Sequence, residues 1–138
     1  MLPTTDAPTG PPPSRRLLSE TTTWLQPLRL AARAPGLRRA ARGDGRLTID
    51  LPGWLAGEAS TAPLRRYLRS LGHDARPWGL GRNGTDVEAT VDRFEERLED
   101  VIGTGDGRPA QLVGWSLGGV VARELARRRP DLVCRLVT

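Results

Sequence analysis

Hydrophobic positions between residues 47 and 137 follow two spacings, one typical of strands and one typical of helices. Short apolar runs occupy 47–51, 110–113 and 132–137, and a weaker run at 74–78 is interrupted by Pro77. Short runs bounded by Gly, Pro or Asp predict β-strands. Between them lie three stretches whose apolar residues stand three and four positions apart, which predicts helices.

The first predicted helix has apolar residues at Leu64, Tyr67, Leu68 and Leu71. We expect Thr61 to cap its N-terminus and Gly72 to be the left-handed residue after its end. The second helix begins at residues 85–88, which have the spacing of a capping box. Its apolar face comprises Val87, Val91, Phe94, Leu98 and Val101. Its other face is acidic, and we expect it to be solvated: Glu88, Asp92, Glu95, Glu96, Glu99 and Asp100.

The third predicted helix runs from Leu117 to about Arg129 and is ended by Pro130. Val120, Val121 and Leu125 are expected to face inward, and Glu124 to pair with Arg128 at the i, i+4 spacing. Strands and helices thus alternate along the chain, which is the signature of parallel α/β architecture. The predicted fold class is α/β, with a parallel sheet, flanking helices and a preceding N-terminal arm.

The first 45 residues differ from the rest in composition. Five prolines and few large apolar residues predict a disordered tail at 1–16, and leucines at helical spacing predict a helical, arginine-rich arm at 17–45. Residues 46–138 form the predicted domain. Residues 1–46 contain eight arginines and three acids, and residues 47–138 contain thirteen of each. The net charge of +5 therefore belongs to the arm, and no nucleic-acid motif accompanies it, so we expect no nucleic-acid partner.

Several classes of site are disfavoured by composition. The chain has no lysine, which excludes a Schiff-base lysine and a P-loop lysine. Its single cysteine, Cys134, lies in an apolar run and is expected to be a small buried residue. We therefore expect no metal and no cofactor. Asn83-Gly84-Thr85 matches a glycosylation sequence, but we see no signal peptide, and no apolar run reaches the ~18 residues of a membrane span. Cytoplasmic location is the default expectation.

The residues with the clearest chemistry are Leu112-Val113-Gly114-Trp115-Ser116-Leu117-Gly118-Gly119. A serine on a sharp strand-to-helix turn is held in a strained conformation, so side chains two residues on either side would collide with the adjoining strand and helix. Gly114 and Gly118 remove that collision, and the Leu117 N–H is left free to stabilise an oxyanion. The alternative is an ordinary glycine-rich β-to-α turn. The spacing does not fit a dinucleotide-binding fingerprint.

Residues 114–119 resemble the nucleophile elbow of α/β-hydrolases of the lipase and esterase type. Leu47–Leu55 resembles the strand and oxyanion loop of the same family, and the resemblance covers residues 46–138. It implies that Ser116 is the nucleophile and that the backbone N–H groups of Leu117 and Trp54 form the oxyanion hole. Leu55 is the other candidate for the second donor, since this chain has Pro52-Gly53 where many relatives have His-Gly. The implied substrate is a small-molecule or lipid-like ester.

The acid and histidine of this family follow the strand after the elbow helix, and no such residues are present here. His73 precedes the serine, and nothing in the sequence brings Asp106 or Asp131 to it. We therefore expect a truncated hydrolase that is nearly inactive alone, with its final strand exposed as an apolar edge open to self-association. The alternative function is a non-catalytic α/β module that binds a ligand or a partner.

Overall fold

The computed structural model describes residues 40–84 and 86–138. The chain divides into two units, Met1–Ala40 and Ala41–Thr138, of which the second is compact. The predicted tail at 1–16 and residues 17–39 of the predicted arm lie outside the described residues. The last residues of that arm, 40–45, have no helical structure.

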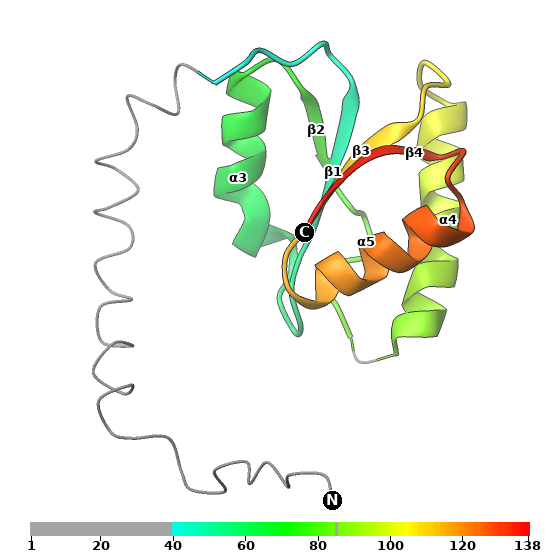
Figure 1. Cartoon of the computed structure of the whole chain (residues 1–138). Coiled ribbons are helices and arrows are strands. Elements are labelled where there is room, and N and C mark those ends of the chain that lie inside the picture. Colours follow the sequence, from blue (N-terminus) through cyan, green and yellow to red (C-terminus); the bar gives the residue numbers. More distant parts are fainter. Residues whose placement is uncertain (1–39, 85) are drawn as a thin grey trace, which may run out of the picture. The chain divides into compact units, whose positions relative to one another are not determined.

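The second unit is a four-stranded sheet whose strands alternate with helices along the chain (Figure 1). Its strands lie in the order β2-β1-β3-β4 and all pair in parallel, which confirms the predicted α/β class. The elements are β1 (Leu47–Leu51), α3 (Glu58–Ser70), β2 (Asp74–Pro77), α4 (Val87–Gly103), β3 (Ala110–Gly114), α5 (Leu117–Arg128) and β4 (Val133–Val137).

Alternate residues of β1 face two different layers of helices. Leu47, Ile49 and Leu51 belong to the main hydrophobic core, together with the buried faces of α4 and α5. Because successive side chains of a strand point to opposite faces, Asp50 faces the other side, where Arg65 of α3 meets it. Figure 1 shows α3 on one side of the strands and α4 with α5 on the other.

Helix α3 differs from its prediction in both its start and its buried face. It begins at Glu58 after Gly57, so Thr61 lies inside the helix and does not cap it. Leu64 is exposed, and the one buried residue of the helix is Arg65. The Arg65 guanidinium lies 3.2 Å from the buried Asp50 carboxylate. Burying a carboxylate is costly unless a cation pairs with it, which accounts for the burial of Arg65. Gly72 has the predicted positive φ, 95°.

Helices α4 and α5 form the opposite layer. Asp86 caps α4 by accepting a hydrogen bond from the Ala89 N–H, one residue later than the predicted capping box. The predicted apolar face of α4 is buried from Val91 to Val101, and Glu124 of α5 pairs with Arg128 as expected. The prediction for Val120 is wrong, since its exposed fraction is 42%. The inward positions of α5 are Gly118, Gly119, Val121, Ala122 and Leu125, and Val120 lies to one side of that stripe.

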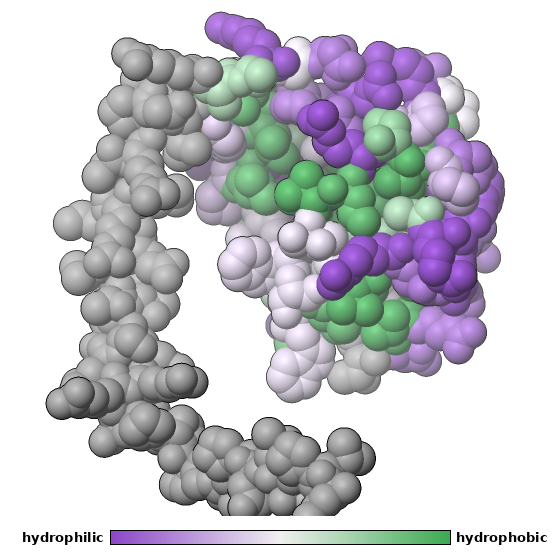
Figure 2. All heavy atoms as spheres, viewed as in Figure 1, coloured by the Kyte–Doolittle hydropathy of each residue, from purple (hydrophilic) through white to green (hydrophobic). Residues whose placement is uncertain are grey.

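Strand β4 is an edge of the sheet, paired on one side with β3. Figure 2 shows hydrophobic side chains at the surface along β4 and hydrophilic ones over α4. Cys134 is exposed, which contradicts its predicted burial, because the register shifts beside Ala110 and turns the thiol outward. Self-association through this edge stays a prediction. Among the described helices, none has both the length and the apolar character needed to cross a bilayer.

Candidate active site

Ser116 stands at the junction of β3 and α5, where the chain turns sharply. β3 ends at Gly114, α5 begins at Leu117, and the Ser116 backbone has a φ of 52° and a ψ of −118°. Positive φ is uncommon for residues with a β-carbon and is found where a surrounding structure holds the strain. The residue is exposed, so its hydroxyl lies at the carboxyl end of the parallel sheet, open to a reactant.

The crowding expected at the two flanking glycines is present. A β-carbon at Gly114 would lie 2.6 Å from the Gly118 carbonyl oxygen and from two backbone atoms of Gly119. A β-carbon at Gly118 would lie 2.4 Å from the Leu51 carbonyl oxygen and 2.6 Å from that of Pro52. The first turn of α5 is therefore pressed against the ends of β3 and β1, and only hydrogen fits at these positions.

The backbone N–H groups of Trp54 and Leu117, the two suggested by the sequence, are among those beside the serine that have no acceptor among the described residues. Leu117 directly follows the serine, and Trp54 lies on the 52–56 loop that lines the same groove as Ser116. The other donor suggested by the sequence, the Leu55 N–H, is bonded to the Asn83 carbonyl oxygen at 2.9 Å. Trp54 is thus the one of the two whose N–H is free to face a ligand.

Comparison with known proteins identifies the family of the chain. Residues 9–138 match the alpha/beta hydrolase family. The chain belongs to this family. Its sequence is 36% identical over 94 residues to a pimeloyl-[acyl-carrier protein] methyl ester esterase of Aromatoleum aromaticum, covering 64% of this chain and 34% of the relative. It is 40% identical over 67 residues to lipase LipV of Mycobacterium tuberculosis, covering 49% of this chain and 23% of the relative.

This alpha/beta hydrolase chain spans about a third of the length of two esterases that it matches, 34% and 36%, and 20% of a third. A solved structure of an extracellular alpha/beta-hydrolase from a Paenibacillus species aligns with 66% of this chain and 38% of its own. The TM-score is 0.48 and the sequence identity is 22%.

A shallow groove of about 550 Å³ opens beside the serine and is lined by Trp54, Ser116, Leu117 and Val120. Apart from the hydroxyl, its side chains are apolar, and the neighbouring surface is apolar too. Trp115 is 76% exposed and Leu55 50% exposed. Large exposed apolar side chains concentrated at one place indicate a binding surface for an apolar group.

The residues considered from sequence as acid or base lie at the other end of the sheet. His73, Asp106 and Asp131 precede β2, β3 and β4, whereas Ser116 follows β3. Since the strands are parallel and rise about 3.3 Å per residue, about 15 Å separates the two ends. The His73 ring lies 3.4 Å from the Thr48 hydroxyl. The groove beside Ser116 has no acid or histidine in its lining.

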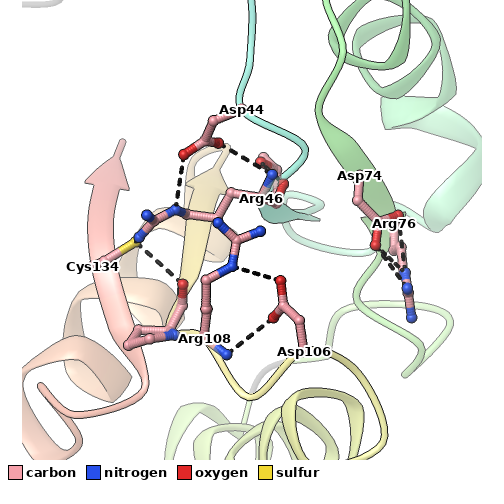
Figure 3. A network of polar contacts seen from close by, with 9 residues as sticks. Asp44, Arg46, Asp74, Arg76, Asp106, Arg108 and Cys134 are labelled. Atoms are coloured by element: carbon pink, nitrogen blue, oxygen red, sulfur yellow. Dashed lines mark hydrogen bonds and ion pairs between the residues drawn. The ribbon is translucent and has the colours of Figure 1, made fainter.

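The acids at that far end of the sheet form ion pairs with arginines. Asp106 accepts from the Arg108 backbone and side chain, which lowers the pKa of this carboxyl, and Asp131 pairs with Arg129. Figure 3 shows the Asp106 pair and, near it, the Cys134 thiol accepting a hydrogen bond from Arg46 at 3.2 Å. Within the described part of the chain, no group of three or more His, Cys, Asp or Glu side chains could hold a metal ion.

Sequence reasoning missed one residue of this site. Asn83 is fully buried beneath the 52–56 loop, and its side-chain amide donates to the Pro52 carbonyl oxygen at 2.7 Å. In the sequence, Asn83 was notable only as part of a chance glycosylation motif. An asparagine in a loop of glycines and arginines carries no signal of burial, because its partners lie about 30 residues away in the chain.

Proposed function

We propose that this chain carries the nucleophile and oxyanion hole of a serine hydrolase of the esterase and lipase type, acting on carboxylic esters. The observation that carries the proposal is Ser116 itself, an exposed serine at a φ of 52° beside two unpartnered N–H groups. A strained, exposed hydroxyl next to fixed donors is suited to attack a carbonyl carbon and to stabilise the resulting oxyanion.

The proposed reaction follows from that placement. The Ser116 Oγ attacks the ester carbonyl carbon and its proton passes to a base, while the carbonyl electrons move to the oxygen held by the Leu117 and Trp54 N–H groups. Collapse of this tetrahedral species expels the alcohol, which takes up the proton, and leaves an acyl group on Ser116. Water then attacks the acyl-enzyme in the same way and releases the carboxylic acid.

The base in this proposal is not one of the described residues, because none of the groove-lining side chains can accept the serine proton. We therefore propose that residues 1–138 alone have little esterase activity. Removing members of a catalytic triad leaves about 10³–10⁴-fold acceleration over water, which comes from the oxyanion hole and substrate binding. A residual rate of that order is what we expect.

The apolar groove and the relatives support an ester with an apolar acyl or alcohol group. The relatives are named for a methyl ester esterase and a lipase, and both names describe carboxylic-ester cleavage. The exposed side chains of Trp54, Trp115 and Val120 offer an apolar group a place to bind near the serine. The second candidate function, a non-catalytic module that binds a ligand or partner, predicts the same groove without chemistry.

Chemical rescue separates these two functions. The 138-residue chain is assayed with p-nitrophenyl acetate while imidazole, which can replace a missing histidine, is added in increasing amounts. Subtracting the rate of Ser116→Ala at each concentration removes hydrolysis by imidazole itself. We expect a small Ser116-dependent rate that rises with imidazole.

Equal rates for Ser116→Ala and the parent at every imidazole concentration would contradict the proposed chemistry and favour the binding module. Fast Ser116-dependent turnover without imidazole would instead support the nucleophile and contradict the expected lack of a base. Unfolding midpoints of the two proteins provide the check that both are folded.

A further inference from the structure

We infer that Asn83 is a positioning residue that aims the Trp54 N–H at the oxyanion. The inference rests on the proposed function and extends it to the loop behind the serine. Asn83 is 0% exposed, and three of its polar groups bind the 52–56 loop. Its side-chain N–H donates to the Pro52 carbonyl oxygen (2.7 Å), its backbone N–H to that of Ala56 (3.0 Å), and its carbonyl accepts from Leu55 (2.9 Å).

These bonds fix the orientation of the Trp54 N–H through the planarity of the peptide unit. The Ala56 N–H donates to the Gly53 carbonyl oxygen at 3.1 Å, which closes a turn over residues 53–56. In a trans peptide the carbonyl and the next N–H point in opposite directions. Holding the Gly53 carbonyl inside the turn therefore directs the Trp54 N–H out of it, and Asn83 anchors both flanks of that turn.

Leu55 gives a second, independent sign that the loop is held under constraint. Its φ is 54°, and apart from Ser116 it is the only non-glycine residue with a positive φ among residues 40–84 and 86–138. Such a conformation costs of order 1 kcal/mol and persists only where the surroundings impose it. The Leu55 N–H is the group that the Asn83 carbonyl accepts, so the same residue holds the strained position.

The third observation is the other half of the Asn83 amide. Its Oδ1 is buried and has no hydrogen-bond partner among the described residues. A buried acceptor without a partner costs about 1–3 kcal/mol, which an apolar side chain of the same size would avoid. An amide at this position therefore stabilises the fold less than an apolar side chain would. We assign its role to the side-chain N–H that donates to the Pro52 carbonyl oxygen.

The Pro52 carbonyl is also where the loop meets the serine helix. A β-carbon on Gly118 would lie 2.6 Å from that oxygen, so the carbonyl is held between the Asn83 amide and the first turn of α5. The loop that carries the Trp54 N–H and the helix that begins at Leu117 therefore meet at the same carbonyl group, that of Pro52. Losing the Asn83 N–H would free the loop to move relative to the helix.

The test compares Asn83→Leu and Asn83→Asp with the parent, and uses Arg82→Gln as the control from the same loop, since Arg82 is exposed. The readout is the Ser116-dependent hydrolysis of p-nitrophenyl acetate in imidazole. We expect Asn83→Leu to lower kcat about 10- to 100-fold with KM within about twofold, and Arg82→Gln to change neither.

Asn83→Asp supplies a readout that a merely structural role would not give. A neutral carboxyl group at this position can donate its O–H to the Pro52 carbonyl, whereas the charged form cannot. The ratio of its rate to that of the parent should therefore be near one at low pH and fall as the new carboxyl ionises. Taking the ratio at each pH cancels the titration of imidazole.

A folded Asn83→Leu chain with the parental kcat, or a pH-independent ratio for Asn83→Asp, would overturn the inference. If Asn83→Leu fails to fold, Asn83→Asp decides alone, and its failure to fold even at pH 5 would show a purely structural role. Absence of any Ser116-dependent rate in the parent is a different result, because it contradicts the proposed function before Asn83 is considered.

Discussion

The Leu51 carbonyl oxygen lies where a β-carbon of residue 118 would have to be. The separation would be 2.4 Å, a distance that real β-carbons essentially never show. The same oxygen accepts the Trp115 N–H at 3.0 Å, so it cannot move away without breaking the link between β1 and the serine turn. The end of β1 and the first turn of α5 are thus joined at a point that tolerates no side chain.

We predict that Gly118→Ala destabilises the protein by about 3 kcal/mol, because the extra methyl group would meet the backbone of both Leu51 and Pro52. Helix propensity alone would favour alanine by up to about 1 kcal/mol. Gly103→Ala, in the last residue of α4 with no atom near its β-carbon position, is the matched control and should be neutral or stabilising. Urea unfolding measures both, and equal stability of the two variants would contradict the prediction.

The buried pair of Asp50 and Arg65 predicts a pH-dependent effect on stability. Burial raises the pKa of Asp50, against the lowering effects of the Thr61 hydrogen bond and the Arg65 charge. A raised pKa means that the folded state holds this proton more tightly than the unfolded state. The contribution of Asp50 to stability is therefore greatest below pH 3.8, and it is lost as the pH rises through the folded pKa.

Arg65→Met removes the cation and should raise the Asp50 pKa further. We predict a small loss of stability below pH 3.8 and a loss of about 3–5 kcal/mol at neutral pH, where an unpaired charge would be buried. Arg66→Met, at the exposed neighbouring position, is the control. Denaturant unfolding from pH 3 to pH 8 tests this, and a loss independent of pH would show that Arg65 acts only through packing.

Most of the elements could be predicted because local spacing decides them. The runs at 47–51 and 110–113 are short and apolar, and the face from Val91 to Val101 has helical period, so burial on one side requires these structures. The glycines at 114 and 118 were predictable for the same reason, since a sharp turn after a strand excludes side chains whatever the rest of the fold.

The errors arose where distant segments decide the outcome. Thr61 was a better local cap than Gly57, but α3 begins earlier, and there the Glu58 carboxylate accepts hydrogen bonds from Gly79 and Gly81. The burial of Arg65 depends on Asp50, 15 residues earlier in the chain. The proposal of Trp54 over Leu55 as the donor rests on the bond from the Leu55 N–H to Asn83, and no spacing in the sequence contains that contact.

Glu124 predicts the opposite pH dependence from Asp50. Hydrogen bonds from Arg127 and Arg128 lower the pKa of Glu124 to about 2. A lowered pKa gives stability that is present above the unfolded value of 4.5 and is lost as the pH falls toward 2. Glu124→Gln should therefore be less stable than the parent at pH 6, and the difference should vanish near pH 2.

The control for this variant is Glu96→Gln, which changes an exposed acid of α4 that has no ion pair among those found in the described chain. The effect of Glu124→Gln is expected to be modest and to shrink in high salt, since the site is exposed. Unfolding curves at low salt, collected from pH 2 to pH 6, measure it. A difference that persists unchanged at pH 2 would contradict the ion-pair origin.

The position of Val120 predicts how the site would distinguish acyl chains. Val120 lines both the groove beside Ser116 and an adjacent groove of about 580 Å³ that also contains Val87. If the acyl group lies along these grooves, we expect a chain of eight carbons to reach Val120 and an acetyl group to end before it. Val120→Ser replaces two methyl groups by one hydroxyl. Because Val120 is 42% exposed, we expect the lost contact with the acyl chain to equal about one methylene, worth about 0.8 kcal/mol. We predict that KM for p-nitrophenyl octanoate rises about fourfold while KM for the acetate is unchanged.

The control variant is Val137→Ser, which changes an exposed valine of β4 and should alter neither KM value. Equal increases for both esters would place the acyl group elsewhere, and no increase would remove Val120 from the binding surface.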